Sequence, residues 1–418
     1  MANKKLEVYY KGIQVGVLAQ MPDKRIAFQY SDNWRKNGFS ISPFSLPLKN
    51  DVFVPSAKTR DYQFGLFGVF ADSLPDNWGN LLLDRYLLSI GVKRDDIDIL
   101  DRLAYVGNSG MGALEYYPAK ESDFNIETSS LNYDEIAREC NNILSSKPSD
   151  KLDLLYKIAG SSGGTRPKIL IKENGEHWIV KFPAKTDLAE SGRIEYEYSK
   201  IAKQCKIHMT ECELLPSKMC GGYFKTKRFD RDNEDKIFSL SFAGILEADF
   251  HAPCLSYSDC MKLVQILTKD LKADKEQMFR TMCFNVLAHN LDDHAKNFSF
   301  LYTEFSGWRL SPMYDLTYSE TYWGEHTTSI NGKGKEIADA DLVKIGTDAG
   351  MKKSDCADIL DGIRKQTGEL AGMLREYQNQ KNNLSLEEKL ADLQDSLDEP
   401  QDNTDSGNAR RKGRKSKQ

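Results

Sequence analysis

One short hairpin constrains the fold of this chain more than any other stretch of its sequence. The run PKILIKENGEHWIVKFP, at 167–183, places two segments of alternating apolar residues on either side of Asn174 and Gly175. An Asn-Gly pair favours the tight two-residue turn of an antiparallel hairpin, because both residues adopt positive φ readily. The pattern therefore predicts a clear β-hairpin in the middle of the chain.

The segments after this hairpin change from strand to helix. GRIEYEYSKIAKQC, at 192–205, has the spacing of a helix, and YFKTKRFDR, at 223–231, predicts a strand that ends in a charged turn. From there to about residue 380 the pattern is mainly helical, with strands predicted around 299–302 and 308–310. The sequence thus predicts an α+β fold in which a strand-rich lobe precedes a helix-rich lobe.

The first part of the chain predicts a small β-rich subdomain. Residues 5–57 have the pattern of short strands and turns, beginning with a hairpin whose turn lies at Lys11 and Gly12. RIAFQYS, at 25–31, predicts a third strand. No repeat of 20 to 50 residues is apparent in the chain.

Helical patterns follow this region. SLPDNWGNLLLDRYLLSIGV predicts a helix with Ser73 as its N-cap, Pro75 near its first turn and Gly91 as its C-cap. YDEIARECNNILSS, at 133–146, predicts a second, amphipathic helix, and a linker rich in Ser, Lys and Asp follows it. We expect a domain boundary near residue 125, where these two parts meet.

Length and composition fit a globular protein of two to three domains. The chain has 418 residues, of which 40% are hydrophobic and 28% charged. We expect an N-terminal subdomain at 1–125, a catalytic domain with a helical C-terminal lobe at 126–380 and a charged tail at 381–418. That tail places Leu386, Leu390, Leu393 and Leu397 on one helical face, then becomes acidic and finally basic without a large apolar residue. Its composition predicts disorder.

Net charge and cysteine content indicate which partners and which cellular compartment to expect. A net charge of -5 argues against strong intrinsic binding to polyphosphates, although six basic residues near the C-terminus form a local exception. Eight cysteines without a C-x-x-C pair suit free thiols in a reducing cytosol. The first residues alternate like a strand rather than forming a signal peptide, and no segment approaches the ~18 apolar residues of a membrane span. We therefore expect a cytoplasmic protein with no membrane association.

A glycine-rich segment could hold phosphate groups. GSSGGTRPK, at 160–168, has glycines that permit close backbone approach and the dihedral angles by which successive N–H groups surround phosphate oxygens. Its spacing matches neither G-x-x-x-x-G-K-[ST] nor G-x-G-x-x-G, so a merely flexible loop remains an alternative.

A lone lysine stands in the apolar strand that follows. Lys181, in WIVKFP, could reach the phosphates of a nucleotide, while Glu195 on the next helix holds its ammonium in place. Protein kinases use this pairing of a strand lysine with a helix glutamate. A lysine extending from an edge strand into solvent is the alternative.

The stretch NVLAHNLDDHAKNFSFLY, at 285–302, concentrates charged and amide groups between two apolar segments. Asp292 and Asn297 have the D-x-x-x-x-N spacing by which a kinase catalytic loop places a carboxylate to accept a hydroxyl proton and an amide to bind Mg²⁺. Asp315, in SPMYDLTYS, could supply a carboxylate to the same metal. Asp293 and His294 could instead cap a helix or bridge strands, and Asp315 could be an N-cap. The four features together, in kinase order, favour phosphoryl transfer.

Other catalytic schemes have less support. The six histidines are too scattered for an H-E-x-x-H motif or a zinc cluster, and no G-x-S-x-G elbow is present. His289 and His294 lie five residues apart, so a zinc pair stays open, although no third ligand is apparent.

These motifs resemble the HipA family of bacterial toxin kinases, the toxin half of type II toxin-antitoxin modules. GLFGVFADSLPDNWGNLLLDR is similar to the N-terminal subdomain of that family, and GSSGGTRPK, WIVKFP, KRFDR, NLDDHAKNFSFLY, WRLSPMYDLT and HTTSINGK follow in family order over nearly the whole chain. The resemblance implies a protein-kinase-like fold. It also implies transfer of phosphate from ATP, with Mg²⁺, to serine or threonine hydroxyls of proteins, aminoacyl-tRNA synthetases among them.

The resemblance also implies roles for particular residues. It makes Asp292 the catalytic base, Asn297 and Asp315 the metal ligands, and Glu195 the structural partner of the nucleotide lysine. It places the following residues at the nucleotide: Gly163, Gly164, Thr165, Arg166, Pro167, Lys168, Lys181, Lys227, Arg228, Phe229, His294, Ala295, Lys296, Asn297, Tyr314 and Asp315. Of these, 227–229 would be the hinge beside adenine. Family toxins phosphorylate a serine in the glycine loop and so inactivate themselves, which makes Ser161 and Ser162 the candidates here. Thr165 and the ending RPK depart from the GAQEK-like ending of some members.

Three functional hypotheses follow. The first is a serine/threonine protein kinase that acts as a toxin, is restrained by a helix-turn-helix antitoxin and touches DNA only through that partner. The second is a catalytically weak, nucleotide-binding corepressor that acts with a DNA-binding antitoxin. The third is a small-molecule kinase on the same fold, since fold and loop do not name the acceptor.

Overall fold

The computed structural model describes residues 4–120, 131–184, 187–321 and 323–380. Residues 1–372 form one compact unit, which contains every candidate site residue. Residues 373–418 form a second unit, of which the described part, 373–380, is helical. The leucine face and the charged tail predicted beyond residue 380 lie outside the described residues. So does most of the region around the predicted domain boundary, because 121–130 are not described.

The N-terminal region contains the predicted β-rich subdomain. Its four antiparallel strands have the order β3-β2-β1-β4. Their bounds are β1 Lys5–Tyr10, β2 Ile13–Gln20, β3 Ile26–Tyr30 and β4 Leu114–Tyr117. The hairpin turn predicted at Lys11 and Gly12 is confirmed, with φ of 48° and 75° at these residues. β4 was not predicted, because it joins β1 from more than 100 residues away along the chain.

Short helices connect this sheet to the rest of the unit. They are α1 Asp32–Asn37, α2 Thr59–Tyr62, α3 Gly68–Ala71, α4 Asn77–Ser89, the 3-10 helix η1 Arg94–Asp96 and α5 Ile99–Val106. The N-cap prediction for the fourth helix is wrong, because α4 begins after Asp76. The hydroxyl of Ser73 instead accepts a hydrogen bond from the Tyr116 hydroxyl at 2.6 Å. The C-cap of α4 is Ile90, and Gly91 follows it with φ of 81°, so the predicted glycine lies one residue beyond the cap.

A second antiparallel sheet follows, with the strand order β5-β6-β8-β7. The strands are β5 Lys168–Glu173, β6 Glu176–Lys181, β7 Cys212–Leu215 and β8 Tyr223–Lys227. The predicted Asn-Gly turn is confirmed, since Asn174 and Gly175 have φ of 52° and 82° between β5 and β6. The helix predicted after the hairpin is α8 Ser191–Gln204, which packs on β7 and β8.

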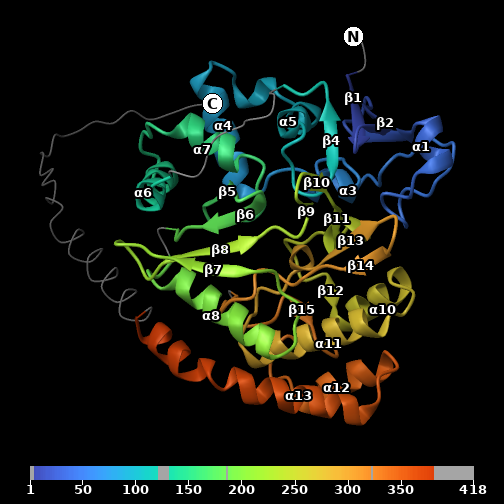
Figure 1. Ribbon diagram of the computed structural model, residues 1–418. Helices are drawn as coiled ribbons and strands as arrows, with labels where there is room; N and C mark the ends of the chain where they lie inside the picture. The colour runs from blue at the N-terminus through green and yellow to red at the C-terminus, as the bar shows by residue number, and fades with distance from the viewer. Residues whose placement is uncertain (1–3, 121–130, 185–186, 322, 381–418) are drawn as a thin grey trace, which may run out of the picture. The chain divides into compact units, whose positions relative to one another are not determined.

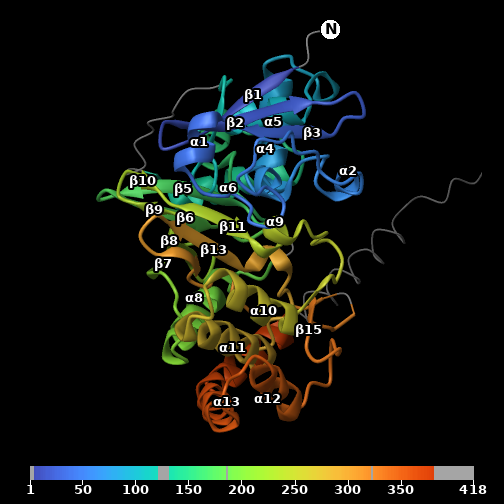
Figure 2. The same cartoon turned by 90° about the vertical axis from the view of Figure 1, so that its right-hand side faces the viewer.

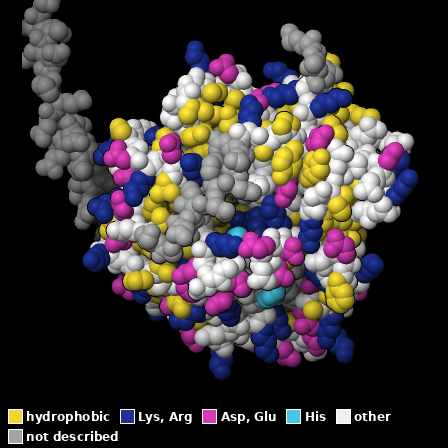
Figure 3. Space-filling model, turned by 45° about the horizontal axis from the view of Figure 1, so that its top comes forward, with side chains coloured by type: hydrophobic (Ala, Val, Ile, Leu, Met, Phe, Trp, Pro, Cys, Tyr) yellow, Lys and Arg dark blue, Asp and Glu magenta, His cyan; other side chains and the backbone are white. Residues whose placement is uncertain are grey.

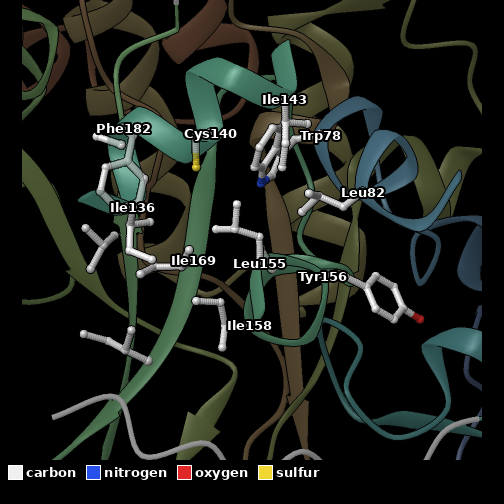
Figure 4. Packing of buried hydrophobic residues seen from close by; sticks show 14 of the residues in the cluster. Trp78, Leu82, Ile136, Cys140, Ile143, Leu155, Tyr156, Ile158, Ile169 and Phe182 are labelled. Atoms are coloured by element: carbon white, nitrogen blue, oxygen red, sulfur yellow. The ribbon is translucent and has the colours of Figure 1, made fainter. Parts of the chain in front are cut away.

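A hydrophobic core joins this sheet to helices that come earlier in the chain. The helices are α4, α6 Tyr133–Leu144 and α7 Leu152–Ala159, and α6 confirms the second predicted helix. Figure 4 shows Trp78 and Leu82 of α4 beside Cys140 and Ile143 of α6, with Leu155 of α7 and Ile169 of β5 in the same cluster. Trp78 is 1% exposed. The core therefore fixes the start of α4 relative to the first strand of the second sheet.

The last part of the unit is mainly helical, as predicted. Its helices are α9 Phe242–Leu246, α10 Tyr257–Leu267, α11 Lys272–Leu287, the 3-10 helix η2 Ala295–Asn297, α12 Asp339–Asp348 and α13 Lys353–Thr367. The strands predicted around 299–302 and 308–310 are confirmed as β13 Ser299–Thr303 and β14 Gly307–Leu310. They form a three-stranded sheet with β11 Phe238–Ser241, in which β13 lies between β11 and β14. Two-residue strands complete the set: β9 Arg231–Asp232, β10 Asp235–Lys236, β12 Leu255–Ser256 and β15 Thr328–Ser329.

The order of these parts in space follows the order of the chain. Figures 1 and 2 both show the blue N-terminal elements on one side of the strands β5 to β8 and the helices α10 to α13 on the other. The second sheet therefore has the N-terminal elements on one side and the helices α10 to α13 on the other. A site at this sheet can include residues from both.

The surface carries charges of both signs. On the face drawn in Figure 3, Lys and Arg side chains are intermingled with Asp and Glu side chains and with apolar ones among the described residues. Among the described residues, no helix is long and apolar enough to cross a membrane. The mixture of charges on this face fits the modest net charge of -5.

Candidate active site

A cavity of about 890 Å³ lies between the second sheet, the helical part and the N-terminal region. Most of the predicted site residues line it. They are Ser162, Gly163, Gly164, Thr165, Arg166, Lys168, Lys181, Glu195, Lys227, Arg228, Phe229, Asp292, His294, Lys296, Asn297, Tyr314 and Asp315. Ser161, Pro167 and Ala295 are predicted residues that do not line it. The volume lies within the range usual for small-molecule and cofactor sites.

Lys181 lies at the centre of an ionic cluster. It ends β6, and its ammonium donates to Glu195 Oε1 at 2.6 Å and to Asp315 Oδ1. Glu195 lies in the second turn of α8, whose packing against β7 and β8 aims the carboxylate at the strand. The predicted lysine–glutamate pair is therefore formed, and Asp315 joins it from a loop 134 residues later in the chain.

Lys181 and Asp315 favour each other's charged form. Burial lowers the pKa of Lys181, but the carboxylates of Asp315 and Glu195 outweigh burial and raise the pKa above its usual range. Burial likewise raises the pKa of Asp315, but Lys181 and Lys168 outweigh it and hold that carboxyl well below its usual range. Asp315 also has a φ of 53°, in the left-handed region that non-glycine residues seldom occupy. A charged group held in such a conformation is typical of functional sites.

The glycine loop contributes a second lysine. Lys168 begins β5 directly opposite Lys181, and its ammonium donates to the carbonyl of Gly163. Burial and the neighbouring Lys181 charge lower the pKa of Lys168 to about 8. Gly164 has a φ of 90°, a conformation that favours glycine, so the loop turns where the sequence predicts a close backbone approach.

The other residues of this loop have defined partners. Arg166 pairs with both carboxylate oxygens of Asp187, at 3.0 and 3.1 Å. The carbonyl of Pro167 accepts the N–H of Phe182 at 2.8 Å, while Thr165 is exposed at the cavity. The two serines are buried: Ser161 Oγ donates to the carbonyl of Ser109 at 2.8 Å. Ser162 Oγ donates to the carbonyl of Ala159 at 2.7 Å.

The predicted catalytic loop comes directly after α11. The backbone N–H of Asp292 donates to the hydroxyl oxygen of Ser319 at 2.9 Å. The side-chain amide of Asn297 donates to the Asp292 carbonyl at 2.7 Å, so the two predicted residues fix each other. Burial raises the pKa of Asp292, partly offset by His294, whose Nε2 lies 3.7 Å from Oδ1. A carboxylate with a raised pKa is a stronger base than an ordinary one.

His294 and Lys296 lie on the same loop. His294 caps η2, since its Nδ1 accepts the N–H of Lys296 at 3.2 Å, and Ala295 is buried within that turn. The ammonium of Lys296 lies 4.5 Å from the centre of the Phe250 ring. Tyr314 donates to the Lys296 carbonyl at 2.6 Å and so ties the loop to the segment that carries Asp315.

Asp293 has a structural environment. It is 1% exposed, and its carboxylate is bonded to the Tyr257 hydroxyl, the His326 ring and the N–H of Thr328, at 2.8 to 2.9 Å. These partners belong to α10 and to the β15 segment. The alternative in which Asp293 bridges strands is thus close to what the structure shows, and the residue anchors the loop rather than facing the cavity.

The predicted hinge residues line the cavity, and two of them form ion pairs with neighbouring carboxylates. Lys227 pairs with Glu176 at 2.6 Å. The guanidinium of Arg228 is buried and binds both carboxylate oxygens of Asp230, at 2.7 and 2.8 Å. Phe229 lies with its ring centre 5.3 Å from that of Tyr314, so it offers an apolar face to the cavity.

Sequence reasoning missed the contribution of the N-terminal region. Asp72 and Asp76 both line the cavity. Asp76 accepts the N–H of Gly164 at 2.7 Å and the ammonium of Lys296 at 2.5 Å. Asp72 accepts both the N–H and the hydroxyl of Ser241, at 2.7 and 2.8 Å. No local pattern in the sequence indicates these contacts, because the partners are 88 to 220 residues apart in the chain.

The donor set fits a magnesium ion held together with phosphate. Mg²⁺ prefers oxygen ligands and is usually bound by one or two protein side chains plus substrate phosphates and water. Asn297 and Asp315 both line the cavity, and Asp315 stays ionised beside Lys181. Among the described residues, no group of three or more His, Cys, Asp or Glu could hold a metal without such help.

Comparison with known proteins agrees with this arrangement. The model for the HipA N-terminal domain matches residues 6–117, and that for the HipA-like C-terminal domain matches 160–370. The protein Y4dM of Sinorhizobium fredii is 25% identical, over 93% of this chain and 95% of its own. The serine/threonine-protein kinase toxin HipA of Shewanella oneidensis is 23% identical, over 76% of each chain.

A solved structure has the same fold. The Shewanella oneidensis HipA chain, in a complex of HipA, HipB and operator DNA, superposes with a TM-score of 0.66. It is 19% identical, with coverage of 89% of this chain and 91% of that one. The predicted α+β, kinase-like fold is therefore confirmed.

Proposed function

The chain belongs to the HipA family of kinase toxins, and on that premise we propose that it is a serine/threonine protein kinase that uses ATP and Mg²⁺. One observation carries the proposal. Lys181, Glu195 and Asp315 form a single ionic cluster in the cavity that Asp292 and Asn297 also line. Protein kinases assemble the same residue types around the phosphates of a nucleotide.

Each side chain has a part in the proposed reaction. The ammonium groups of Lys181 and Lys168 face the phosphates, and the glycine loop approaches them with its backbone. Asn297 and Asp315 would hold the metal ion, which would neutralise charge on the phosphates. Asp292 accepts the proton of the acceptor hydroxyl while the oxygen of that hydroxyl forms a bond to the γ-phosphorus of ATP. The bond between the γ-phosphorus and the oxygen that bridges it to the β-phosphorus breaks, and ADP leaves.

Autophosphorylation and the toxin role belong to the same proposal. The buried hydroxyls of Ser161 and Ser162 donate to backbone carbonyls, so phosphorylation of either one requires the glycine loop to leave its present place. A phosphoserine would then add nearly two negative charges beside the proposed phosphate site. We propose a helix-turn-helix antitoxin as partner, by analogy with the HipB in the Shewanella complex. The expected acceptor is a translation protein, such as an aminoacyl-tRNA synthetase.

Transfer of label from ATP tests this proposal. The purified chain, given radiolabelled ATP and Mg²⁺, should label itself or a protein in cell extract. Asp292→Asn should reduce the rate about 100-fold or more, because a general base contributes on that order. Asp361→Asn, an exposed carboxylate on α13, is the matched control. Label that appears only in small metabolites would favour a small-molecule kinase instead, and label unaffected by Asp292→Asn would contradict the assignment of the base.

A corepressor role is the second candidate. In that role the chain binds nucleotide and assembles with a DNA-binding antitoxin, but transfers no phosphate. Growth arrest that survives Asp292→Asn would favour it over the kinase.

A further inference from the structure

Asp76 uses both of its carboxylate oxygens to join two loops of the cavity. Oδ2 accepts the N–H of Gly164 at 2.7 Å, and Oδ1 accepts the ammonium of Lys296 at 2.5 Å. The residue occupies the N-cap position of α4, but its side chain makes no capping hydrogen bond to that helix. The carboxylate is therefore directed at the glycine loop and the catalytic loop rather than at its own helix.

The first turn of α4 packs directly on the glycine loop. The N–H of Trp78 donates to the Gly164 carbonyl at 3.4 Å, and its indole N–H donates to the Lys168 carbonyl at 3.0 Å. Gly79 fits against the same loop, since a Cβ there would lie 2.8 Å from the carbonyl oxygen of Gly160. The N–H of Gly164 is thus bonded to Asp76, directly before α4, and the carbonyl of Gly164 is bonded to Trp78 within α4.

The charge of Asp76 is balanced within the cavity. Burial raises the pKa of its carboxyl, but Lys296, the N–H of Gly164 and Lys168 together outweigh burial, and the pKa is lowered. The carboxylate of Asp76 is also in direct contact with a cationic side chain, since its Oδ1 lies 2.5 Å from Lys296 Nζ. Asp76 therefore does not present an uncompensated negative charge to an entering phosphate, which makes a role in holding the loop more consistent than a role in blocking it.

We propose that Asp76 is a positioning residue that holds the glycine loop against the catalytic loop, so that the loop backbone is already in place for nucleotide phosphates. A loop held in its bound conformation loses less entropy when the ligand arrives, and the ligand binds more tightly. The inference rests on the proposed function, since it assumes that the phosphates of ATP lie at this loop. It assigns to the N-terminal region a direct part in nucleotide binding.

Comparison of ATP with adenosine separates positioning from general stability. Asp76→Ala removes a hydrogen bond to a charged group, so the Kd for ATP with Mg²⁺, measured by titration calorimetry, should rise about tenfold, or about 1.4 kcal/mol. Adenosine has no phosphates to place at the loop, so its Kd should change less than about threefold by the same reasoning. Asp76→Asn keeps an oxygen for the Gly164 N–H but places an amide NH2 group towards the Lys296 ammonium, so it should restore only part of the ATP affinity.

Two further variants keep the test sharp. Asp84→Asn is the matched control, because Asp84 lies on the same helix and pairs with Arg102 at 2.7 Å but does not line the cavity. It should leave the affinity for both ligands unchanged. If Asp76→Ala does not fold, Asp76→Ser replaces it, since serine is a good N-cap but is too short to join both loops.

The outcomes distinguish the positioning role of Asp76 from the proposed kinase function on which it rests. A parent chain that binds neither ATP nor adenosine overturns both. A parent chain that binds ATP, with Asp76→Ala binding it equally well or more tightly, overturns the positioning role alone. An equal loss for ATP and adenosine shows a general structural effect and also overturns it.

Discussion

Two loops of one cavity are held in different ways. The catalytic loop at 290–297 is anchored from the helical part of the chain, where the buried carboxylate of Asp293 meets partners on α10 and beside β15. The glycine loop at 160–168 is held by Asp76 and Trp78, at the start of a helix from the N-terminal region. The catalytic loop therefore has its main anchor in its own lobe, with one further contact from Lys296 to Asp76, whereas the glycine loop is held by residues some 90 positions earlier.

This difference suggests that the chemical step and the binding of phosphate groups depend on different parts of the chain. Changes in the helical part should alter the chemistry, because they move the proposed base. Changes in the N-terminal region should alter the binding of phosphate groups, because they move the glycine loop. Substitutions at the anchor of each loop test this division.

The largest expected effect is on the anchor of the glycine loop. Trp78→Ala removes a side chain that is 1% exposed in the core shared by α4, α6, α7 and the second sheet. The free energy of unfolding, measured by urea titration, should fall by about 4 kcal/mol. Phe305→Ala is the control, because that ring is fully exposed and its loss should cost less than about 0.5 kcal/mol. Equal effects of the two substitutions would mean that α4 is not part of the core.

The anchor of the catalytic loop should give the next largest effect. Asp293→Ala leaves the Tyr257 hydroxyl, the His326 ring and the Thr328 N–H without their common acceptor. Unsatisfied buried groups of this kind should lower the free energy of unfolding by about 3 kcal/mol. Asp361→Ala, on an exposed position of α13, serves as control in the same urea titration. A loss below about 1 kcal/mol would show that the loop is held by other contacts.

A smaller effect should appear in the pH dependence of ATP binding. Lys168 has a pKa of about 8 in the fold, so its ammonium is present below that pH and lost above it. If only the charged form binds phosphate, the Kd for ATP should rise about tenfold between pH 7 and pH 9. Unfolding does not explain such a rise, because a lysine with a lowered pKa makes the fold more stable as the pH increases from 8 towards its ordinary value.

A matched variant checks that interpretation. Lys168→Arg keeps its charge over this whole range, so its Kd for ATP should be nearly independent of pH. If the parent chain and Lys168→Arg show the same pH profile, another group is responsible and Lys168 does not contact the phosphates.

The smallest effect should come from one hydrogen bond between α4 and β5. Trp78→Phe keeps an aromatic ring in the core but loses the indole N–H that donates to Lys168 at 3.0 Å. The free energy of unfolding should fall by about 1 kcal/mol, well short of the loss in Trp78→Ala. A loss as large as that in Trp78→Ala would show that the hydrogen bond, rather than packing, holds the helix.

The same contrast between the two loops limits what could be predicted from the sequence. The hairpin around Asn174 and Gly175 was predictable, because turn chemistry and alternation are local properties. So was the pairing of Lys181 with Glu195, since a strand and the next helix are neighbours in the chain. The spacing of Asp292 and Asn297 likewise lies within one short loop. Their catalytic and metal-binding roles stay predictions, as does the assignment of a glycine-loop serine.

Contacts between distant segments could not be predicted. Asp76 meets Lys296 across 220 residues of sequence, and nothing near either residue indicates the other. The N-cap prediction at Ser73 was wrong for a similar reason. The Ser73 hydroxyl accepts a hydrogen bond from Tyr116, which lies on a strand 43 residues later in the chain. Such positions obey tertiary packing rather than local propensity.

Steady-state kinetics with varied ATP tests the division between the two loops most directly. Asp292→Asn should lower kcat about 100-fold or more while leaving the KM for ATP nearly unchanged, because a base acts in the chemical step. Asp76→Ala should raise the KM for ATP about tenfold and keep kcat within about threefold at saturating ATP, since it acts on binding. If Asp292→Asn retains the kcat of the parent chain, the cavity does not carry out phosphoryl transfer in the way that its residues indicate.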